Sequence, residues 1–96
     1  MLILVTYDVS TETKEGRRRL HRVAKRCIAH GQRVQNSVFE CKIDYSQYLS
    51  LQNELKQIIK EEEDSLRFYN LGINHDNKVI HVGKNKTNPV DGDLII

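Results

Sequence analysis

The stretch that decides the fold of this chain is LILVTYDV, residues 2–9. It is apolar or β-branched with almost no break before Tyr7 and Asp8, which is typical of a central strand covered on at least one face. The polar residues that interrupt it and the lack of a basic leader argue against a secretory signal. We therefore expect a strand in a soluble, cytoplasmic protein that makes no contact with a membrane.

Helical and strand patterns alternate downstream of this strand. Hydroxyl and acidic residues at 10–13 suit a helix N-terminus, and apolar residues then recur at three- and four-residue steps until Gly31, the expected stop. The next segment forms either one bent strand or a tight hairpin around Asn36 and Ser37. The expected elements are a strand at 2–9, a helix to about residue 30, the strand or hairpin at 32–42, a helix over roughly 45–62 and a strand at 65–71.

This order of elements predicts an α+β fold of the ferredoxin-like βαββαβ type. In that plan one antiparallel sheet carries both helices on one face. A chain of 96 residues forms one domain. Its core is thin, so chemistry is expected on a surface or at a subunit interface.

The C-terminal part of the sequence contains segments that the ferredoxin-like fold does not account for. Residues 78–83 predict a further short strand, and the chain ends in the apolar triplet 94–96. We assign residues 1–83 to the ferredoxin-like domain and residues 84–96 to a linker and strand that pack on a partner subunit. The expected state is a homodimer, and the alternative is that the last strand joins the sheet of its own chain.

Positive charge is concentrated in the first helix and the strand after it. Residues 14–33 carry a charge of +7 and the rest of the chain −5, within a net charge of +2. Because solvated helix faces usually mix positive and negative charges, this excess of positive charge favours contacts with phosphate. Aromatic residues that could stack on bases are scarce, which favours binding of a duplex over binding of a single strand. The alternative is a solvated helix face. The arginines expected to contact phosphate are Arg17, Arg18, Arg19 and Arg22, and Arg33 completes the expected nucleic-acid-binding set.

Asp8 is the candidate for catalysis and metal binding. It follows the apolar strand directly, with Tyr7 beside it, and Arg33 is expected on a strand that lies close to it. Mg²⁺ often takes only one or two protein carboxylates and completes its shell with water and phosphate oxygens. One aspartate per chain is therefore sufficient, and two symmetry-related copies of Asp8 would offer a pair. The alternative is that Asp8 caps the following turn.

Other chemistries have little support in the sequence. Cys27 and Cys41 lack the spacing of a zinc site or a disulfide framework and are expected to be buried thiols in a reducing compartment. The histidines lack metal-ligand spacing, and Ser37 has no partnered base near it in sequence. A toxin-like ribonuclease is therefore disfavoured, because no catalytic histidine or serine constellation is visible.

Four stretches together resemble the CRISPR-associated protein 2 family, the small dimeric subunit of the spacer-acquisition machinery. They are LILVTYDV at 2–9, RRRL at 17–20, GQRVQNSVFE at 31–40 and KVIHVG at 78–83. The first and third are specific in combination. The form QRVQNSVFE looks most like members from type I-C systems.

The resemblance implies a dimer whose C-terminal strand adds to the partner's sheet, and a metal-dependent endonuclease acting on RNA or double-stranded DNA. It implies Mg²⁺ or Mn²⁺ as the cofactor and assembly with the CRISPR-associated protein 1 integrase in spacer acquisition. It also leaves open a non-catalytic role, a bridge that holds duplex DNA between integrase subunits and needs the arginines but not Asp8. By position, Asp8 matches the metal-linked aspartate, Tyr7 its neighbour, and the polar and supporting positions around the dimer cleft are Arg17, Arg19, Arg33, Ser37 and Phe39.

Overall fold

The computed structural model describes residues 1–73 and 78–83. Four strands and two helices follow one another in the expected order, which confirms the ferredoxin-like α+β fold. Residues 32–42 form a hairpin of two strands, so the alternative of one bent strand is wrong. The elements are β1 (Leu2–Asp8), α1 (Lys14–His30), β2 (Gln32–Gln35), β3 (Val38–Lys42), α2 (Tyr45–Ile58) and β4 (Ser65–Gly72).

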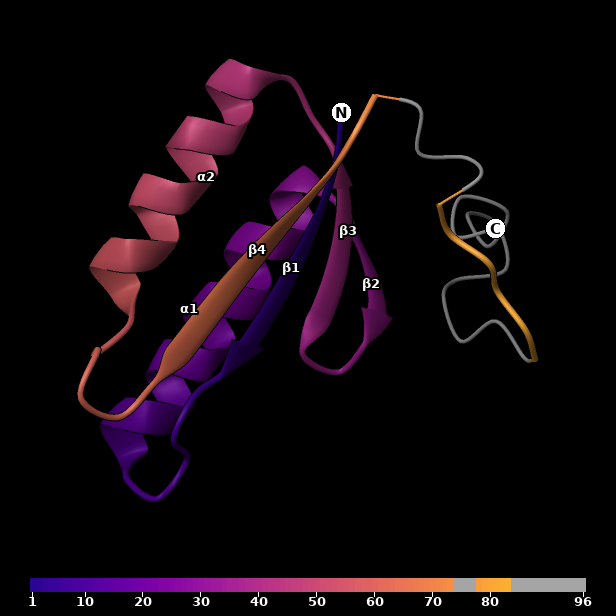
Figure 1. The fold of residues 1–96 in the computed structure, drawn as a ribbon. Coiled ribbons are helices and arrows are strands. Elements are labelled where there is room, and N and C mark those ends of the chain that lie inside the picture. The colour runs from indigo at the N-terminus through magenta and orange to yellow at the C-terminus, as the bar shows by residue number, and fades with distance from the viewer. Residues whose placement is uncertain (74–77, 84–96) are drawn as a thin grey trace.

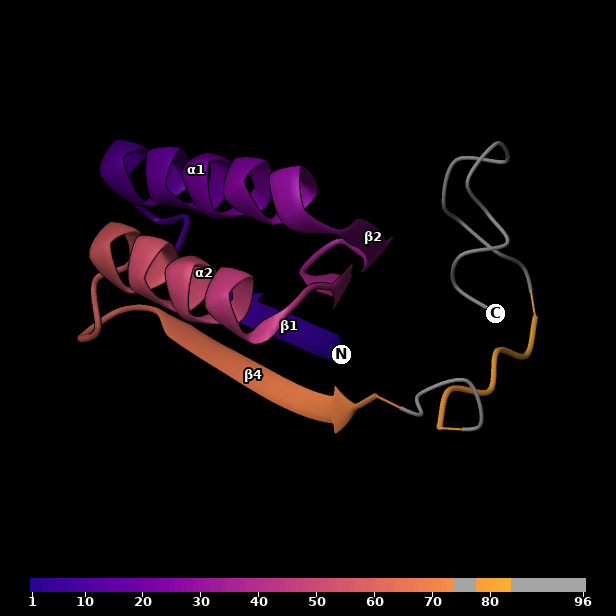
Figure 2. The same ribbon diagram turned by 90° about the horizontal axis from the view of Figure 1, so that it is seen from above.

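The four strands form one antiparallel sheet in the order β2-β3-β1-β4. β1 is central, as its apolar sequence predicts, and it pairs with β3 on one side and β4 on the other. Both helices cover the same face of the sheet (Figures 1 and 2). We call the other side the open face, and on β1 it carries the side chains of Leu4, Thr6 and Asp8.

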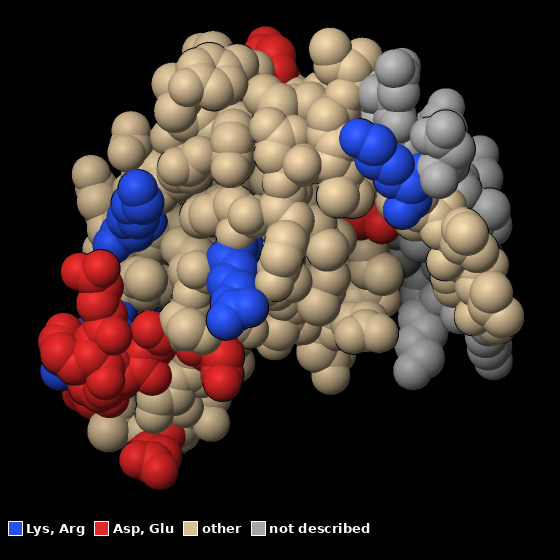
Figure 3. Space-filling view, in the orientation of Figure 1, with Lys and Arg blue, Asp and Glu red and all other residues tan. Residues whose placement is uncertain are grey.

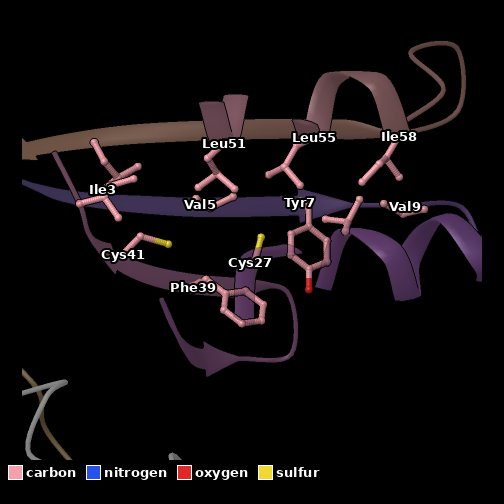
Figure 4. Packing of buried hydrophobic residues seen from close by; sticks show 12 residues of the cluster. Ile3, Val5, Tyr7, Val9, Cys27, Phe39, Cys41, Leu51, Leu55 and Ile58 are labelled. Carbon is pink, nitrogen blue, oxygen red and sulfur yellow. The ribbon is translucent and has the colours of Figure 1, made fainter. Parts of the chain in front are cut away.

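The hydrophobic core lies between the sheet and the two helices. Because side chains alternate along a strand, every second residue of β1 points toward the helices, and Ile3, Val5 and Tyr7 are buried there. They meet apolar residues from α1, α2 and β3 (Figure 4). These residues are Val23 and Cys27 of α1, Leu51, Leu55 and Ile58 of α2, and Phe39 and Cys41 of β3.

Local contacts explain where α1 begins and ends. Thr13 is the N-cap, and its hydroxyl oxygen accepts a hydrogen bond of 3.0 Å from the backbone N–H of Gly16. Gly31 ends the helix as expected, but in an extended conformation with φ −165°. Its glycine identity reflects close packing, since a Cβ there would lie 2.3 Å from the carbonyl oxygen of Glu40.

The second helix is shorter than the sequence predicts. α2 ends at Ile58, four residues before the expected end at residue 62. The backbone N–H of Lys60 donates to the Asp64 carboxylate at 2.9 Å, and the N–H of Asp64 donates back to the Lys60 carbonyl at 2.8 Å. This turn supplies the hydrogen bonds that further helix would have made, and it directs the chain into β4.

The prediction of a strand over residues 78–83 is wrong for the single chain, because the structure shows no strand there. Ile80 and Val82 are 86% and 89% exposed, so neither side chain packs against the sheet. The expected linker and terminal strand at 84–96 lie outside the described residues. No helix in the part of the chain that the structure describes is long and apolar enough to cross a membrane.

Candidate functional site

Asp8 lies at the end of β1, on the open face. It is exposed, and its cross-strand partner is Ser65, the first residue of β4. Its carboxylate makes no hydrogen bond or ion pair within residues 1–73 and 78–83. The turn-cap interpretation is therefore wrong, because Thr13 caps the helix that follows and Asp8 is left available to a ligand.

Tyr7 anchors the end of the strand that carries Asp8. Its ring stacks on that of Phe39, with centroids 6.1 Å apart and an interplanar angle of 20°. The Tyr7 hydroxyl donates to the carbonyl of Asn36 at 3.2 Å, and its backbone N–H donates to the carbonyl of Ser37 at 3.1 Å. Burial raises the pKa of Tyr7, so the phenol stays protonated and fixed. Tyr7 and Phe39 thus act as scaffold.

Arg33 does not lie beside Asp8 within one chain. It is on β2, and β3 separates β2 from β1. The register pairs Arg33 with Phe39, and its guanidinium carbon lies 5.2 Å from the centroid of that ring. Phe39 belongs to the helix-covered side of the sheet, so Arg33 and Asp8 are on opposite faces as well as two strands apart.

The arginines of α1 divide into two groups. Arg18 and Arg22 are exposed and have no acidic partner in the described residues, so they remain available to phosphate. Arg17 is also exposed and donates to the carbonyl of Thr11 at 3.1 Å. Arg19 is different, because its Nε donates to the Asp64 carboxylate at 2.8 Å and its side chain is only 13% exposed. The structure therefore assigns Arg19 to an internal ion pair.

Asp64 is the residue that the sequence analysis missed. Its side chain is fully buried and accepts hydrogen bonds from the backbone of Ser10 at 3.0 Å, the backbone of Lys60 at 2.9 Å and the guanidinium of Arg19. Burial alone would raise its pKa, but the Arg19 guanidinium and the two amide donors outweigh this and lower the pKa below its ordinary value.

Asp64 holds the two segments that flank Asp8. Ser10 follows Asp8 by two residues, and Ser65, next to Asp64 in sequence, pairs with Asp8 across the sheet. In sequence, Asp64 is simply the last member of an acidic run, the other members of which are exposed. The only available signal was its position directly before a strand.

The charges on the open face are not those of a basic groove. In Figure 3, which looks onto this face, acidic side chains gather at the lower left, where the loop between α2 and β4 turns in Figure 1, and basic side chains are scattered. Arg18 and Arg22 belong to the helix layer on the other side of the sheet. Arg18 and Arg22 therefore face a different direction from Asp8.

A metal ion at Asp8 would find few protein ligands in one chain. No group of three or more histidine, cysteine, aspartate or glutamate side chains is placed to hold a metal among the residues described. A single carboxylate can still bind Mg²⁺ when water and phosphate oxygens fill the other positions. The arrangement suits an ion shared with a nucleic-acid phosphate or with a second subunit.

Comparison with known proteins places this geometry in a family. Residues 1–79 match the family model described as CRISPR associated protein Cas2. The chain is 52% identical over 95 residues to a CRISPR-associated endonuclease Cas2 of Halalkalibacterium halodurans, covering 99% of each chain. It is 51% identical over 96 residues to a CRISPR-associated endoribonuclease Cas2 of Chlorobaculum tepidum, covering all of both. A crystal structure of Streptococcus pyogenes Cas2 superposes with a TM-score of 0.75 at 53% identity, covering 86% of this chain and all of that one.

Proposed function

Because this chain belongs to the CRISPR-associated protein Cas2 family, we propose that it is a metal-dependent endonuclease of CRISPR adaptation. It hydrolyses phosphodiester bonds in double-stranded DNA or RNA, in the cytoplasm, as a partner of the CRISPR-associated protein 1 integrase. The names of its full-length relatives, endonuclease and endoribonuclease, support the activity. The observation that carries the proposal is the exposed carboxylate of Asp8, which has no partner among the described residues and lies on the face of the sheet opposite α1 and α2.

Asp8 fits a hard divalent cation. Mg²⁺ and Mn²⁺ prefer oxygen ligands, and the Asp8 oxygens have no competing partner in the described chain. When bound, such an ion polarises the phosphate and makes a bound water more acidic. The chain itself contributes the position of the carboxylate, because β1 is hydrogen-bonded on both sides and Asp64 fixes the loop that follows.

A homodimer completes this site. The open face carries Leu4, Val38 and Tyr69, the last of them 42% exposed, so a second copy can cover apolar area there. Stacking two open faces around a two-fold axis brings the two Asp8 side chains toward each other. β4 is also an edge strand of the sheet in the part of the chain that the structure describes, and the exposed residues Ile80 and Val82 suit a strand added to that edge of a second copy.

The substitution Asp8→Asn tests the proposed activity. It keeps the size of the side chain but removes the charge that holds the ion, so we expect cleavage of labelled duplex DNA and RNA in Mg²⁺ to fall by about 100-fold or more. Affinity for the uncleaved duplex and the melting temperature should not change. Glu61→Gln, at an exposed position in the loop before β4, is the matched control. Wild-type cleavage rates in a highly purified Asp8→Asn protein would refute the proposal.

A second candidate function is a non-catalytic bridge that holds duplex DNA between integrase subunits. It is favoured by Arg18 and Arg22, which are unpaired and belong to the layer opposite Asp8, so that they can bind DNA without presenting it to that residue. Phosphate contacts of this kind supply affinity without reading sequence.

Salt dependence of binding tests the bridge. Arg18→Ala and Arg22→Ala should each lower the slope of log K against log salt concentration by about one, because each removes one phosphate contact. Lys56→Ala, which removes the same charge from an exposed position on α2, should leave the slope unchanged. Equal slopes for all three variants and the wild type would contradict the bridge. Spacer acquisition in cells that carry Asp8→Asn then separates the two functions, since only the nuclease requires Asp8.

A further inference from the structure

The open face places an arginine next to Asp8 that sequence patterns do not single out. In the pairing of β1 with β4, Asp8 is opposite Ser65 and Thr6 is opposite Arg67. Cross-strand partners point to the same face, so Arg67 shares the open face with Asp8 and is its diagonal neighbour. Diagonal neighbours have Cβ atoms roughly 7 Å apart, a gap that a long side chain spans.

Arg67 has free hydrogen-bonding capacity. It is exposed, and its only contact in the described residues is a hydrogen bond of 3.3 Å from its guanidinium to the Tyr69 hydroxyl. A guanidinium has five N–H donors, so most of them remain available. By contrast, Arg19 and Arg26 are engaged with Asp64 and Glu54.

Arg67 and Asp8 do not form an ion pair with each other, although both are charged and lie on one face. The space between an unpaired guanidinium and an unpaired carboxylate can therefore hold a group that bridges them. The other lysine or arginine that β1, β3 or β4 directs to this face is Lys42, opposite Leu2. It lies six residues along β1 from Asp8, about 20 Å away.

We propose that Arg67 binds the scissile phosphate at the Asp8 site. This inference rests on the proposed nuclease function and adds the residue that holds the substrate. The planar guanidinium donates to two non-bridging phosphate oxygens, a geometry that lysine cannot reproduce. Tyr69 lies opposite Leu4, on the side of Arg67 away from Asp8, so its hydroxyl occupies one N–H of the guanidinium and leaves the others free to donate to the phosphate.

Arg67 remains protonated through hydrolysis. The oxygen of a water molecule forms the new bond to phosphorus, and the bond to the leaving sugar oxygen breaks with its electron pair on that oxygen. The attacking water loses a proton to solvent, and the leaving oxygen takes one from solvent. Negative charge that builds up on the non-bridging oxygens during this step is stabilised by the guanidinium.

The test compares the cleavage rates of the full-chain variants Arg67→Ala, Arg67→Lys and Tyr69→Phe on a short fluorescein-labelled duplex and its RNA counterpart. We expect Arg67→Ala to lower kcat/KM by about 100-fold, the loss that other enzymes show when one hydrogen-bond donor to the transition state is removed. Arg67→Lys should recover only part of this, and Tyr69→Phe, which removes only the hydroxyl that Arg67 contacts, should change the rate far less. Millimolar guanidinium chloride should partly restore cleavage to Arg67→Ala and not to Asp8→Asn. Lys56→Ala is the charge-matched control.

Three outcomes would overturn the inference, and they differ from one another. If Asp8→Asn abolishes cleavage while Arg67→Ala cleaves at the wild-type rate, the nuclease stands and Arg67 has no part in it. If Asp8→Asn still cleaves, the proposed nuclease fails and the inference fails with it. If Arg67→Ala loses activity only because it becomes monomeric by light scattering, with no rescue by guanidinium, Arg67 is an interface residue.

Discussion

Replacement of Asp64 by alanine should destabilise the protein by releasing the loops that flank Asp8. The fully buried carboxylate accepts hydrogen bonds from Ser10 N, Lys60 N and the guanidinium of Arg19. Each amide that loses its acceptor costs about 1 kcal/mol, and loss of a hydrogen bond to a charged group costs about 1.5–3 kcal/mol. The upper sum is roughly 5 kcal/mol, and water entry into the loop recovers part of it. We expect the free energy of unfolding to fall by about 3 kcal/mol.

Urea titration followed by circular dichroism measures this loss at a fixed protein concentration, which matters if the protein dimerises. In a chain of this size, about 3 kcal/mol also lowers the melting temperature by roughly 12–24 °C. Glu61→Ala changes an exposed acid in the same loop and should alter stability by less than about 0.5 kcal/mol. A loss below about 1 kcal/mol for Asp64→Ala would show that the carboxylate does not hold the loop.

The pH and thiol chemistry of the folded chain give two further predictions. The pKa of Asp64 is lower than its ordinary value of 3.8, so its contribution to stability is complete above about pH 4 and is lost as the pH falls through the folded-state pKa. The difference in urea midpoint between wild type and Asp64→Asn should therefore shrink as the pH falls below about 4, and a constant difference would refute the assignment. Burial raises the pKa of Cys27 to about 12 and that of Cys41 to about 11. Both thiols should resist a thiol-reactive dye at pH 8 until urea unfolds the protein, and rapid labelling of the native state would contradict the core packing.

The fold could be predicted from the sequence because its signals are local. The apolar run at 2–5 and the helical spacing of Leu51, Leu55 and Ile58 each specify an element without reference to distant residues. The end of α2 was missed because it depends on hydrogen bonds between Lys60 and Asp64, which helical periodicity does not report. The strand at 78–83 was predicted from composition, but a strand needs a neighbour, and Ile80 and Val82 have none in the described chain.

The candidate site was only partly predictable, because it depends on which face of the sheet each residue occupies. Asp8 was found from its position after an apolar strand. Arg33 was expected beside it, but strand order and register place it two strands away on the other face. The pairing of Arg19 with Asp64 joins residues 45 positions apart, so a charge count along the helix could not reveal it. The assignment to a type I-C system remains a prediction.

The central position of β1 also affects how the protein is made. β1 leaves the ribosome before both of its sheet neighbours, β3, completed at Lys42, and β4, completed at Gly72. At about 5–20 residues per second, the 64 residues from Asp8 to Gly72 take roughly 3–13 s to synthesise, and during this time the apolar strand lacks a partner on one edge. The apolar strand β1 therefore stays without its second sheet neighbour until β4 has been synthesised, and we expect chaperones that bind exposed apolar segments to act on the nascent chain during that interval.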